Sequence, residues 1–583
     1  MSLLQSLKPS LKRTKYRLQH MIASYRVLPD WNKILGVDME TWNAARTQAN
    51  GPHVLIATGG GGHPGVTPLE GMLGVALTLR GARVHYLLCD QFLPACLQAM
   101  HFLWRDSAAV ARHGPRSLCR SCYRAGYNSY APLGLPIHRY GDLVTPEEQM
   151  QARKIARSLP IQSIKTYTLD GLAIGEHAIA GALRYFATGE LTGEPHSEPI
   201  ARRYLEASIL SMFAVRRLVQ QYPFHSAVFH HGIYVPQGIV GEVCRQAGIG
   251  VVNWVPAYRT SSFIFSHDDT YHHTLMTEPT ILWEHLPWSE DLENETLDYL
   301  KSRWHGIRDW IYFTHEQPQE DLQQIQAETG ICFDKPTIGL LTNVMWDAQL
   351  HYPANAFPNM LDWVLQTISY FAKRPDLQLL IRVHPAELRG SIPSRQPILR
   401  EIQRVFPVLP SNIYIIPPES NISTYAAMLQ CDSVIIYGTK TGVELTSLGI
   451  PVIVAGEAWI RGKGLTIDVQ DSEQYFHILD QLPLGRRLDE ATVRRARMYA
   501  YHFFFRRMIP LRCAVKTPRS LRTVWGWWSY ELQVAHPKEL LPGHDLGLDT
   551  ICDGILTGRP FVYPAEVVSR PETSTSAVEA TRR

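Results

Sequence analysis

The sequence predicts an α/β protein in which two doubly wound parallel sheets face each other across a cleft. Short apolar segments of strand length alternate with segments of helical periodicity in two separate parts of the chain. In each part a glycine-containing turn follows a strand and precedes a helix. Parallel strands joined by helices are covered on both faces, and 583 residues suffice for two such domains. Ligands of such sheets bind at the carboxyl ends of the strands.

The composition favours a folded globular protein. Hydrophobic residues make up 45% and charged residues 19% of the chain, which argues against a disordered chain. The formal net charge of +3 is small for this length, whereas a nucleic-acid-binding protein would carry a stronger positive field. No window of about 18 uncharged apolar residues occurs, and no signal-peptide pattern is found. We therefore expect a cytoplasmic protein that does not bind nucleic acid.

A basic segment precedes the first strand. Residues 1–26 contain six lysines and arginines, no acidic residue and several leucines. This pattern fits a packed or solvated helix, or a basic amphipathic segment that rests on anionic lipid. Contact with the inner face of the cytoplasmic membrane, or with export machinery, therefore stays open as an alternative.

The first β-α-β unit follows this segment. Residues 54–57 form an apolar strand, and the four glycines of 59–62 make a turn into an amphipathic helix. Gly81 ends that helix, and residues 84–88 form the next strand.

The glycine run is a candidate ligand-binding loop. Glycine lets the backbone approach a ligand closely, so we expect Gly60, Gly61 and Gly62 to contact an acceptor or a diphosphate. The spacing matches neither the P-loop nor the dinucleotide fingerprint, so neither ATP nor NAD is implied. His63 ends the run and is a candidate general base, since imidazole titrates near neutral pH. A tight turn with a surface histidine is the alternative.

A second β-α-β unit spans residues 226–254. Its strand, 227–229, ends in His230-His231-Gly232, and a helix over 236–247 leads to the strand 249–254. Adjacent histidine side chains diverge, so a shared metal ion is not expected. His231 is a candidate catalytic or acceptor-contacting residue, and a packed histidine is the alternative.

Strand–helix alternation resumes after Pro336. The expected elements are strand 337–341, helix 359–373, strands 377–383 and 412–416, helix 423–431, strand 433–436, helix 441–449, and strand 451–455. An arginine- and aromatic-rich helix over 488–508 follows. It packs back across the domains or, alternatively, forms a rim that touches bilayer headgroups.

Two clusters of polar residues lie at strand ends in this half. Arg382, His384 and Glu387 follow one strand. The second cluster leads from a glycine turn into a helix and consists of Gly438, Thr439, Lys440, Thr441, Gly442 and Glu444. Its glycine turn and hydroxyls offer donors to phosphate, its lysine and the arginine neutralise phosphate charge, and its glutamate can accept from two ribose hydroxyls.

These motifs carry a resemblance to a known family. Arg382-x-His384-Pro385-x-Glu387, followed by Tyr437-Gly438-x-x-x-Gly442-x-Glu444, resembles the capsule polysaccharide biosynthesis family. That family includes bacterial Kdo-transferring enzymes and has the GT-B fold of two Rossmann-like domains. The resemblance covers about residues 337–470. The glycine run that ends in His63 also looks like the first loop of lipid-linked peptidoglycan-precursor glycosyltransferases.

The resemblance implies a glycosyltransferase that moves a sugar from a nucleotide-sugar donor to a polysaccharide or lipid-linked glycan acceptor. His384 would contact the donor's phosphate or base, Glu444 the ribose, and Gly438 with Thr439 the phosphate. Asp347 is the best candidate for the catalytic carboxylate, although an acid after a strand is often a helix cap. A nucleotide-sugar 2-epimerase, or a non-catalytic assembly protein of this fold, remains the alternative.

The expected organisation follows from these assignments. It comprises a basic segment 1–50, an N-terminal acceptor domain 51–325, a C-terminal nucleotide-sugar domain 326–487, helices 488–563 that pack back across both, and a disordered tail 564–583.

No cofactor besides the nucleotide sugar is expected. Cys89-x6-Cys96 and Cys119-x2-Cys122 are weighed as a structural zinc site or an iron–sulfur cluster. The second pair has zinc-knuckle spacing, but the first pair does not, and a buried free cysteine behaves as a small apolar residue. We therefore expect unligated thiols and no metal, with zinc at Cys119 and Cys122 as the less favoured reading.

Overall fold

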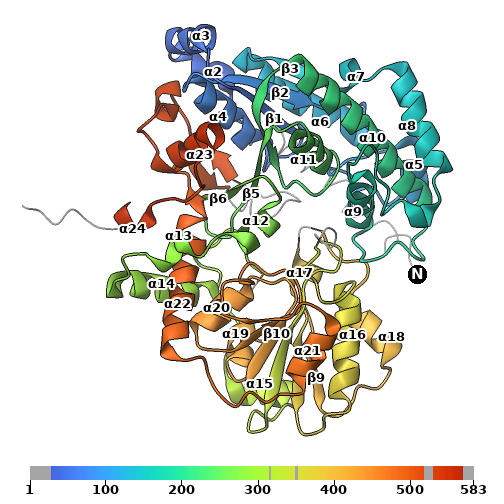
Figure 1. Ribbon diagram of the computed structural model, residues 1–583, viewed down its shortest axis with the longest axis vertical. Coiled ribbons are helices and arrows are strands. Elements are labelled where there is room, and N and C mark those ends of the chain that lie inside the picture. The colour runs from blue at the N-terminus through green and yellow to red at the C-terminus, as the bar shows by residue number, and fades with distance from the viewer. Residues whose placement is uncertain (1–27, 314–316, 348–351, 391, 518–529, 569–583) are drawn as a thin grey trace, which may run out of the picture.

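The computed structural model describes residues 28–313, 317–347, 352–390, 392–517 and 530–568, and it contains two α/β units, one above the other in Figure 1. Each unit holds an open, mainly parallel sheet with helices on both faces, which confirms the predicted fold class. The basic segment 1–26 and all but the first five residues of the predicted tail lie outside the described residues.

The described N-terminal sheet has the strand order β13-β6-β5-β4-β1-β2-β3. Its strands are β1 (His53–Gly59), β2 (Arg83–Leu88), β3 (Ile137–Arg139), β4 (Phe224–His230), β5 (Gly250–Pro256), β6 (Ser262–His267) and β13 (Ile509–Pro510). Strands β1 to β5 are parallel, β6 pairs antiparallel with β5, and β13 at the edge pairs antiparallel with β6. The order reverses between β1 and β4, which creates a switch point of the kind that binds ligands.

Helices cover both faces of this sheet. The helices of this part of the chain are α2 (Trp31–Gly36), α3 (Met39–Gln48), α4 (Thr67–Thr78), α5 (Ser107–His113), α6 (Arg116–Tyr130), α7 (Tyr140–Leu143), α8 (Pro146–Ser158), α9 (Ile174–Phe186), α10 (Ser197–Gln221), α11 (Gln237–Gln246), α12 (Tyr271–Thr277), α13 (Ile281–Glu284) and α14 (Glu290–Arg303), of which α13 and α14 pack against α22. Every residue of α4 is buried, because the helix lies beneath α6 and α23 as well as against the sheet.

The described C-terminal sheet has the order β12-β11-β10-β7-β8-β9. Its elements are α15 (Leu322–Thr329), β7 (Thr337–Leu341), α16 (Met360–Phe371), β8 (Gln378–Arg382), α17 (Ala386–Arg389), α18 (Ile398–Val405), β9 (Ile413–Ile416), α19 (Thr424–Met428), β10 (Ser433–Ile436), α20 (Thr441–Ser447), β11 (Val452–Val454), β12 (Ile467–Asp468) and α21 (Ser472–Leu479). Val434 and Ile436 pack on one face and Ile435 on the other, so both faces are buried.

The chain crosses between the two units twice. The described residues 304–313 and 317–321 lie between α14 and the C-terminal unit, and α22 (Glu490–Tyr501) with a π-helical turn, His502–Arg506, leads back. The chain then adds β13, β14 (Ala514–Lys516), β15 (Tyr530–Leu532), α23 (Leu546–Thr557) and α24 (Ala565–Val568). Helix α23, red in Figure 1, packs on α4 of the N-terminal unit.

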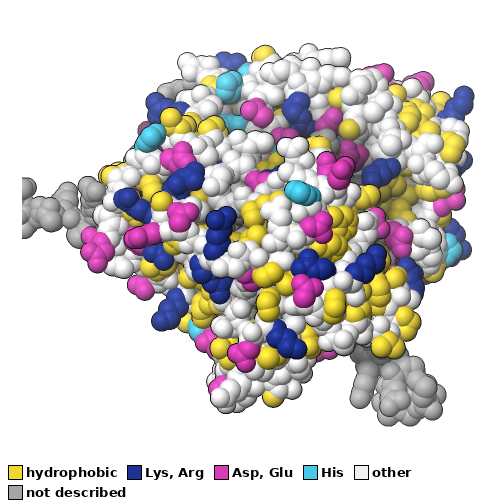
Figure 2. All heavy atoms as spheres, turned by 60° about the horizontal axis from the view of Figure 1, so that its bottom comes forward, with side chains coloured by type: hydrophobic (Ala, Val, Ile, Leu, Met, Phe, Trp, Pro, Cys, Tyr) yellow, Lys and Arg dark blue, Asp and Glu magenta, His cyan; other side chains and the backbone are white. Residues whose placement is uncertain are grey.

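The visible surface mixes charges of both signs. Figure 2 shows Lys and Arg side chains interspersed with Asp and Glu over one face, in keeping with the small net charge. Among the residues that the structure describes, no helix is both long and apolar enough to cross a membrane.

Candidate functional site

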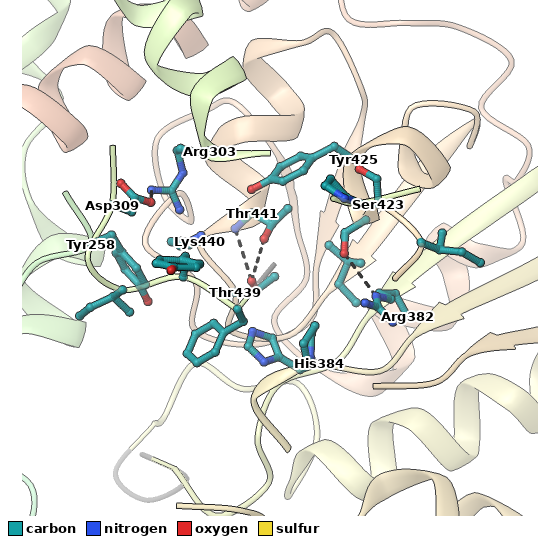
Figure 3. Close-up of a pocket in the computed structure, with 18 of the residues that line it drawn as sticks. Tyr258, Arg303, Asp309, Arg382, His384, Ser423, Tyr425, Thr439, Lys440 and Thr441 are labelled. Carbon is teal, nitrogen blue, oxygen red and sulfur yellow. Dashed lines mark hydrogen bonds and ion pairs between the residues drawn. The ribbon is translucent and has the colours of Figure 1, made fainter. Parts of the chain in front are cut away.

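A pocket lies between the two units, at the carboxyl edge of the C-terminal sheet (Figure 3). The strand order reverses between β7 and β10, so the loops after these strands open at the sheet's switch point. Lining residues from the C-terminal unit include Arg382, His384, Thr439, Lys440 and Thr441. Across from them lie Tyr258, Arg303, Asp309, Tyr312 and Phe313, which come from the N-terminal unit and the first crossing.

Arg382 is a buried cation whose described hydrogen bonds all go to neutral acceptors. It ends β8 and is 4% exposed. Its Nη1 donates to the Pro417 carbonyl at 2.5 Å, Nη2 to the Ser420 carbonyl at 3.2 Å, and Nε to Thr424 Oγ1 at 3.3 Å. Burial lowers the pKa of Arg382 to about 10, so it remains charged at neutral pH. The guanidinium therefore gives the pocket a positive charge that an anionic ligand can neutralise.

His384 presents a neutral ring to the pocket. Its backbone amide donates to Thr342 Oγ1 at 3.1 Å, and its Nδ1 accepts from the Ala386 amide at 3.1 Å. Burial lowers its pKa to about 3, and the charges of Lys440 and Arg382 add to the effect. Since Nδ1 is an acceptor, the proton of the neutral ring lies on Nε2. His384 is thus a hydrogen-bond donor at neutral pH without a charge of its own.

The turn after β10 contributes two hydroxyls and an amine. Thr439 Oγ1 lies 3.1 Å from Thr441 Oγ1 and accepts from the Thr441 amide at 3.3 Å. Lys440 Nζ lies 4.7 Å from the centre of the Tyr258 ring, across the gap between the units. Burial lowers the pKa of Lys440. These groups and Arg382 face the same pocket, as predicted from their positions at strand ends.

Glu444 lies behind the pocket rather than on its surface. It is 1% exposed and accepts from Arg303 Nε at 3.1 Å, from Lys440 Nζ at 3.0 Å and from the Tyr425 hydroxyl. Burial would raise the pKa of Glu444, but the charges of Arg303 and Lys440 lower it to about 2. Arg303 also pairs with Asp309. Glu444 could make the predicted contact with a ribose only by giving up hydrogen bonds that it accepts from Arg303, Lys440 or Tyr425.

Glu387 and the predicted glycines do not line the pocket. Glu387 is 1% exposed, and its Oε1 accepts from the Ile398 amide at 3.1 Å, where α18 begins. A Cβ at Gly442 would lie 2.7 Å from Ile436 Cδ1, so Gly442 allows α20 to approach β10. Gly438 stands at the turn, with the Glu457 carbonyl 3.3 Å from the position of its absent Cβ.

The glycine run has a different neighbour from the one predicted. Gly59 has a φ of 77°, which the turn after β1 requires. Gly61 and Gly62 are buried against α6: a Cβ at Gly61 would lie 2.5 Å from Gly126 Cα, and one at Gly62 would lie 2.8 Å from Cys122 Cα. Two of the three predicted ligand-binding glycines, Gly61 and Gly62, therefore accommodate a helix, whereas Gly60 lies beside Gln98.

The three predicted catalytic residues lie at or facing the N-terminal switch point. His63 is 2% exposed, and its ring centre lies 5.5 Å from that of His230. The ring of His231 lies 4.9 Å from that of Tyr234, whose hydroxyl donates to Asp347 Oδ1 at 2.8 Å. Asp347 comes from the C-terminal unit, so this group of residues joins the two units.

His231 has two unusual features. Its φ is 71°, a left-handed conformation that costs energy for a side chain with a Cβ. Its buried Nδ1 has no hydrogen-bond partner within the described part of the chain, and burial lowers its pKa to about 3. A neutral imidazole of this kind can accept a hydrogen bond from a bound hydroxyl, but its low pKa makes it a weak base.

Sequence reasoning missed Tyr258, Arg303 and Asp309. They lie in a stretch where no regular pattern was recognised, and tertiary contacts bring them to the pocket. A weak signal existed, since Tyr258 follows the end of β5 by two residues.

His273 forms an ionic contact between the units that should be sensitive to pH. Its Nδ1 lies 2.8 Å from Asp269 Oδ2, and its Nε2 lies 3.1 Å from Glu457 Oε2 of the C-terminal unit. Burial alone would lower the pKa of His273, but hydrogen bonds to the two carboxylates raise it to about 10. The protonated ring therefore contributes stability in full below pH about 6.5, and this contribution is lost as the pH rises through about 10.

We expect His273→Gln to lower the free energy of unfolding by about 1–3 kcal/mol at pH 6. The difference from the unchanged protein should shrink toward pH 10. Urea unfolding at several pH values measures both effects, and a difference that does not vary with pH would contradict the assigned charge.

No family model matches this chain, and no curated protein matches it in sequence. Among solved structures, the β-Kdo 2,4-transferase of Thermosulfurimonas dismutans KpsC is 14% identical over 47% of this chain and 79% of its own, with a TM-score of 0.32. The β-Kdo 2,7-transferase of the same KpsC is 13% identical over 49% and 79%, with a TM-score of 0.29. The UDP-GlcNAc 2-epimerase of Neisseria meningitidis is 10% identical over 77% and 97%, with a TM-score of 0.25. Identities this low say nothing about the activity of this chain. The similar structures thus include two Kdo transferases and a UDP-GlcNAc 2-epimerase.

Proposed function

We propose that the protein is a glycosyltransferase that moves a sugar from a nucleotide-sugar donor to a surface or capsular polysaccharide acceptor, which can be lipid-linked. The observation that carries this proposal is the pocket at the carboxyl edge of the C-terminal sheet. There Arg382, His384 and Lys440 meet at the switch point, with the hydroxyls of Thr439 and Thr441 beside them.

The donors of this pocket suit a phosphorylated nucleoside. Arg382 can bind phosphate oxygens with two N–H groups, and the His384 ring adds a donor with its proton fixed on Nε2. Tyr312 and Phe313 provide apolar surface for a base or sugar. Cations beside a departing phosphate stabilise the charge that develops in the transition state, which is the main catalytic contribution that this site offers.

The N-terminal switch point suits an acceptor. His231 Nδ1 has no hydrogen-bond partner within the described part of the chain, the Tyr234 ring lies beside the His231 ring, and the Tyr234 hydroxyl donates to Asp347. Asp347 also adds to the raised pKa of Tyr258, which burial dominates, so its charge acts on the rim of the donor pocket. His231 can then accept a hydrogen bond from an acceptor hydroxyl, and Asp347 can take its proton, while the donor occupies the neighbouring pocket.

Incubation with candidate nucleotide sugars, with and without lipid extract, tests the reaction class. Release of nucleotide that depends on the acceptor supports transfer. Interconversion of the sugar without acceptor would identify an epimerase instead, and binding without turnover would identify an assembly protein.

His384→Ala tests the donor pocket. We expect the affinity for the accepted nucleotide sugar to fall about 10-fold, since one hydrogen bond to a charged group contributes about 1.5 kcal/mol. We also expect the affinity of the unchanged protein to show no step near pH 6.5, because His384 stays neutral there. Isothermal titration at pH 5.5–8 measures both. His477→Ala, on the exterior helix α21, is the control and should bind normally. If His384→Ala bound the nucleotide sugar with unchanged affinity, the donor would not bind in this pocket.

A further inference from the structure

Four cysteines from distant parts of the sequence line one cavity in the N-terminal unit. Cys89 follows β2, Cys96 lies in the loop beyond it, and Cys119 and Cys122 lie one turn apart on α6. Each is partly exposed, and none forms a disulfide. The remaining lining comes from neutral residues, namely Thr58, Gly59, Gly60, Gln91, Leu93, Leu97, Gln98, Leu118, Pro236 and Gln237.

A backbone amide is directed at one of these sulfurs. The Gly62 amide donates to Cys122 Sγ at 3.2 Å. An N–H donor directed at sulfur suits a cysteine that binds metal as a thiolate.

The four cysteines share a cavity without converging as the ligands of a single ion. A tetrahedral zinc ion holds each sulfur at about 2.3 Å, which brings its ligands close together. Within the described ranges, no three His, Cys, Asp or Glu side chains meet closely enough to hold one metal ion. The four cysteines nevertheless line the same cavity. An iron–sulfur cluster distributes four cysteine ligands over several metal atoms, so its sulfurs lie farther apart.

The glycine run explains how the cavity is built. Because Gly61 and Gly62 lack side chains, α6 approaches the end of β1 until Gly126 and Cys122 touch the loop. This approach brings Cys119 and Cys122 opposite Cys89 and Cys96. The glycines predicted to bind a ligand directly thus serve a site formed by the cysteines.

We propose that Cys89, Cys96, Cys119 and Cys122 bind an iron–sulfur cluster that fastens α6 and the loop after β2 to the carboxyl end of β1. The site is separate from the donor pocket and does not depend on the proposed transferase activity. The thiols lose their protons when the cluster forms, and the bound cluster stabilises the fold because the unfolded chain has no preformed site.

Anaerobic preparation of the full chain with iron and sulfide tests this proposal. We expect iron and acid-labile sulfide in equal amounts, at least about two of each per chain, with the broad visible absorbance of an iron–sulfur cluster. Cys119→Ser and Cys96→Ser should each lose most of the iron and the absorbance. Cys431→Ser, which changes a buried thiol of the C-terminal unit, should retain both.

A measurement on the unchanged protein covers the case in which these variants do not fold. Removal of iron with an oxidant and a chelator should lower its melting temperature by several degrees, and anaerobic reconstitution should restore it. The proposal is overturned if the unchanged protein retains no iron and sulfide, if it retains zinc instead, or if Cys431→Ser loses as much iron as Cys119→Ser.

Discussion

Replacement of Arg382 by glutamine should reduce the affinity for the nucleotide-sugar donor by about 30- to 1000-fold. Arg382 is a buried cation that donates hydrogen bonds only to neutral oxygens within the described structure. Its positive charge is therefore available in full to an anionic nucleotide sugar. Removal of one partner from a buried, hydrogen-bonded charge pair costs about 2–4 kcal/mol, which converts to that range. Titration calorimetry measures the change directly.

Two further variants separate a direct contact from a general charge effect. Arg382→Lys retains the charge but not the bidentate geometry of the guanidinium. Its affinity for the nucleotide sugar should therefore lie between that of the unchanged protein and that of Arg382→Gln. Arg389→Gln removes a neighbouring charge on α17 that lies outside the pocket lining, and it should change the affinity less than about 3-fold. Equal losses of affinity in Arg389→Gln and Arg382→Gln would show that the positive charge of the region attracts the nucleotide sugar without direct contact to Arg382.

Glu444→Ala should lower the free energy of unfolding by about 3–5 kcal/mol. Glu444 neutralises Arg303 and Lys440 in a fully buried group, and its loss leaves two cations facing only Asp309. Breaking a buried ion pair by removal of one partner costs about this much. Because Arg303 belongs to α14 and Glu444 to α20, the loss also weakens the contact between the two units.

The pH dependence of this effect has a definite sign. The pKa of Glu444 is lowered to about 2, so its contribution is complete above pH about 4.5 and is lost as the pH falls through about 2. Urea unfolding should therefore show the variant approach the unchanged protein in acid. Glu328→Ala on the exposed surface of α15 is the control, with an expected effect below about 0.5 kcal/mol. A Glu444→Ala protein as stable as this control would contradict the structure of the buried group.

Hydrophobic periodicity was sufficient to predict the core of both sheets. Strand β7 has the predicted limits, and Arg382 and His384 reach the pocket because strand ends in a parallel sheet share one edge. The strands β6 and β13 were not predicted, and β13 in particular pairs with a strand that is distant from it in sequence.

The glycine run shows a limit of another kind. A glycine-rich turn before a helix fits close approach of a phosphate, but it fits close approach of another helix equally well, since both need the absence of a Cβ. At Gly61 and Gly62 the partner is α6. Likewise, the sequence around Glu444 fits a ribose contact, and only the position of Arg303 shows that its oxygens are already engaged.

The return of the chain to its first sheet affects how the protein can be made on the ribosome. Strand β6 ends at His267, and its neighbour β13 begins at Ile509, about 240 residues later. At about 5–20 residues per second, translation of that stretch takes about 12–48 s. For that time the nascent N-terminal unit lacks an edge strand and the helix that covers α4, so its final assembly follows the synthesis of the whole C-terminal unit.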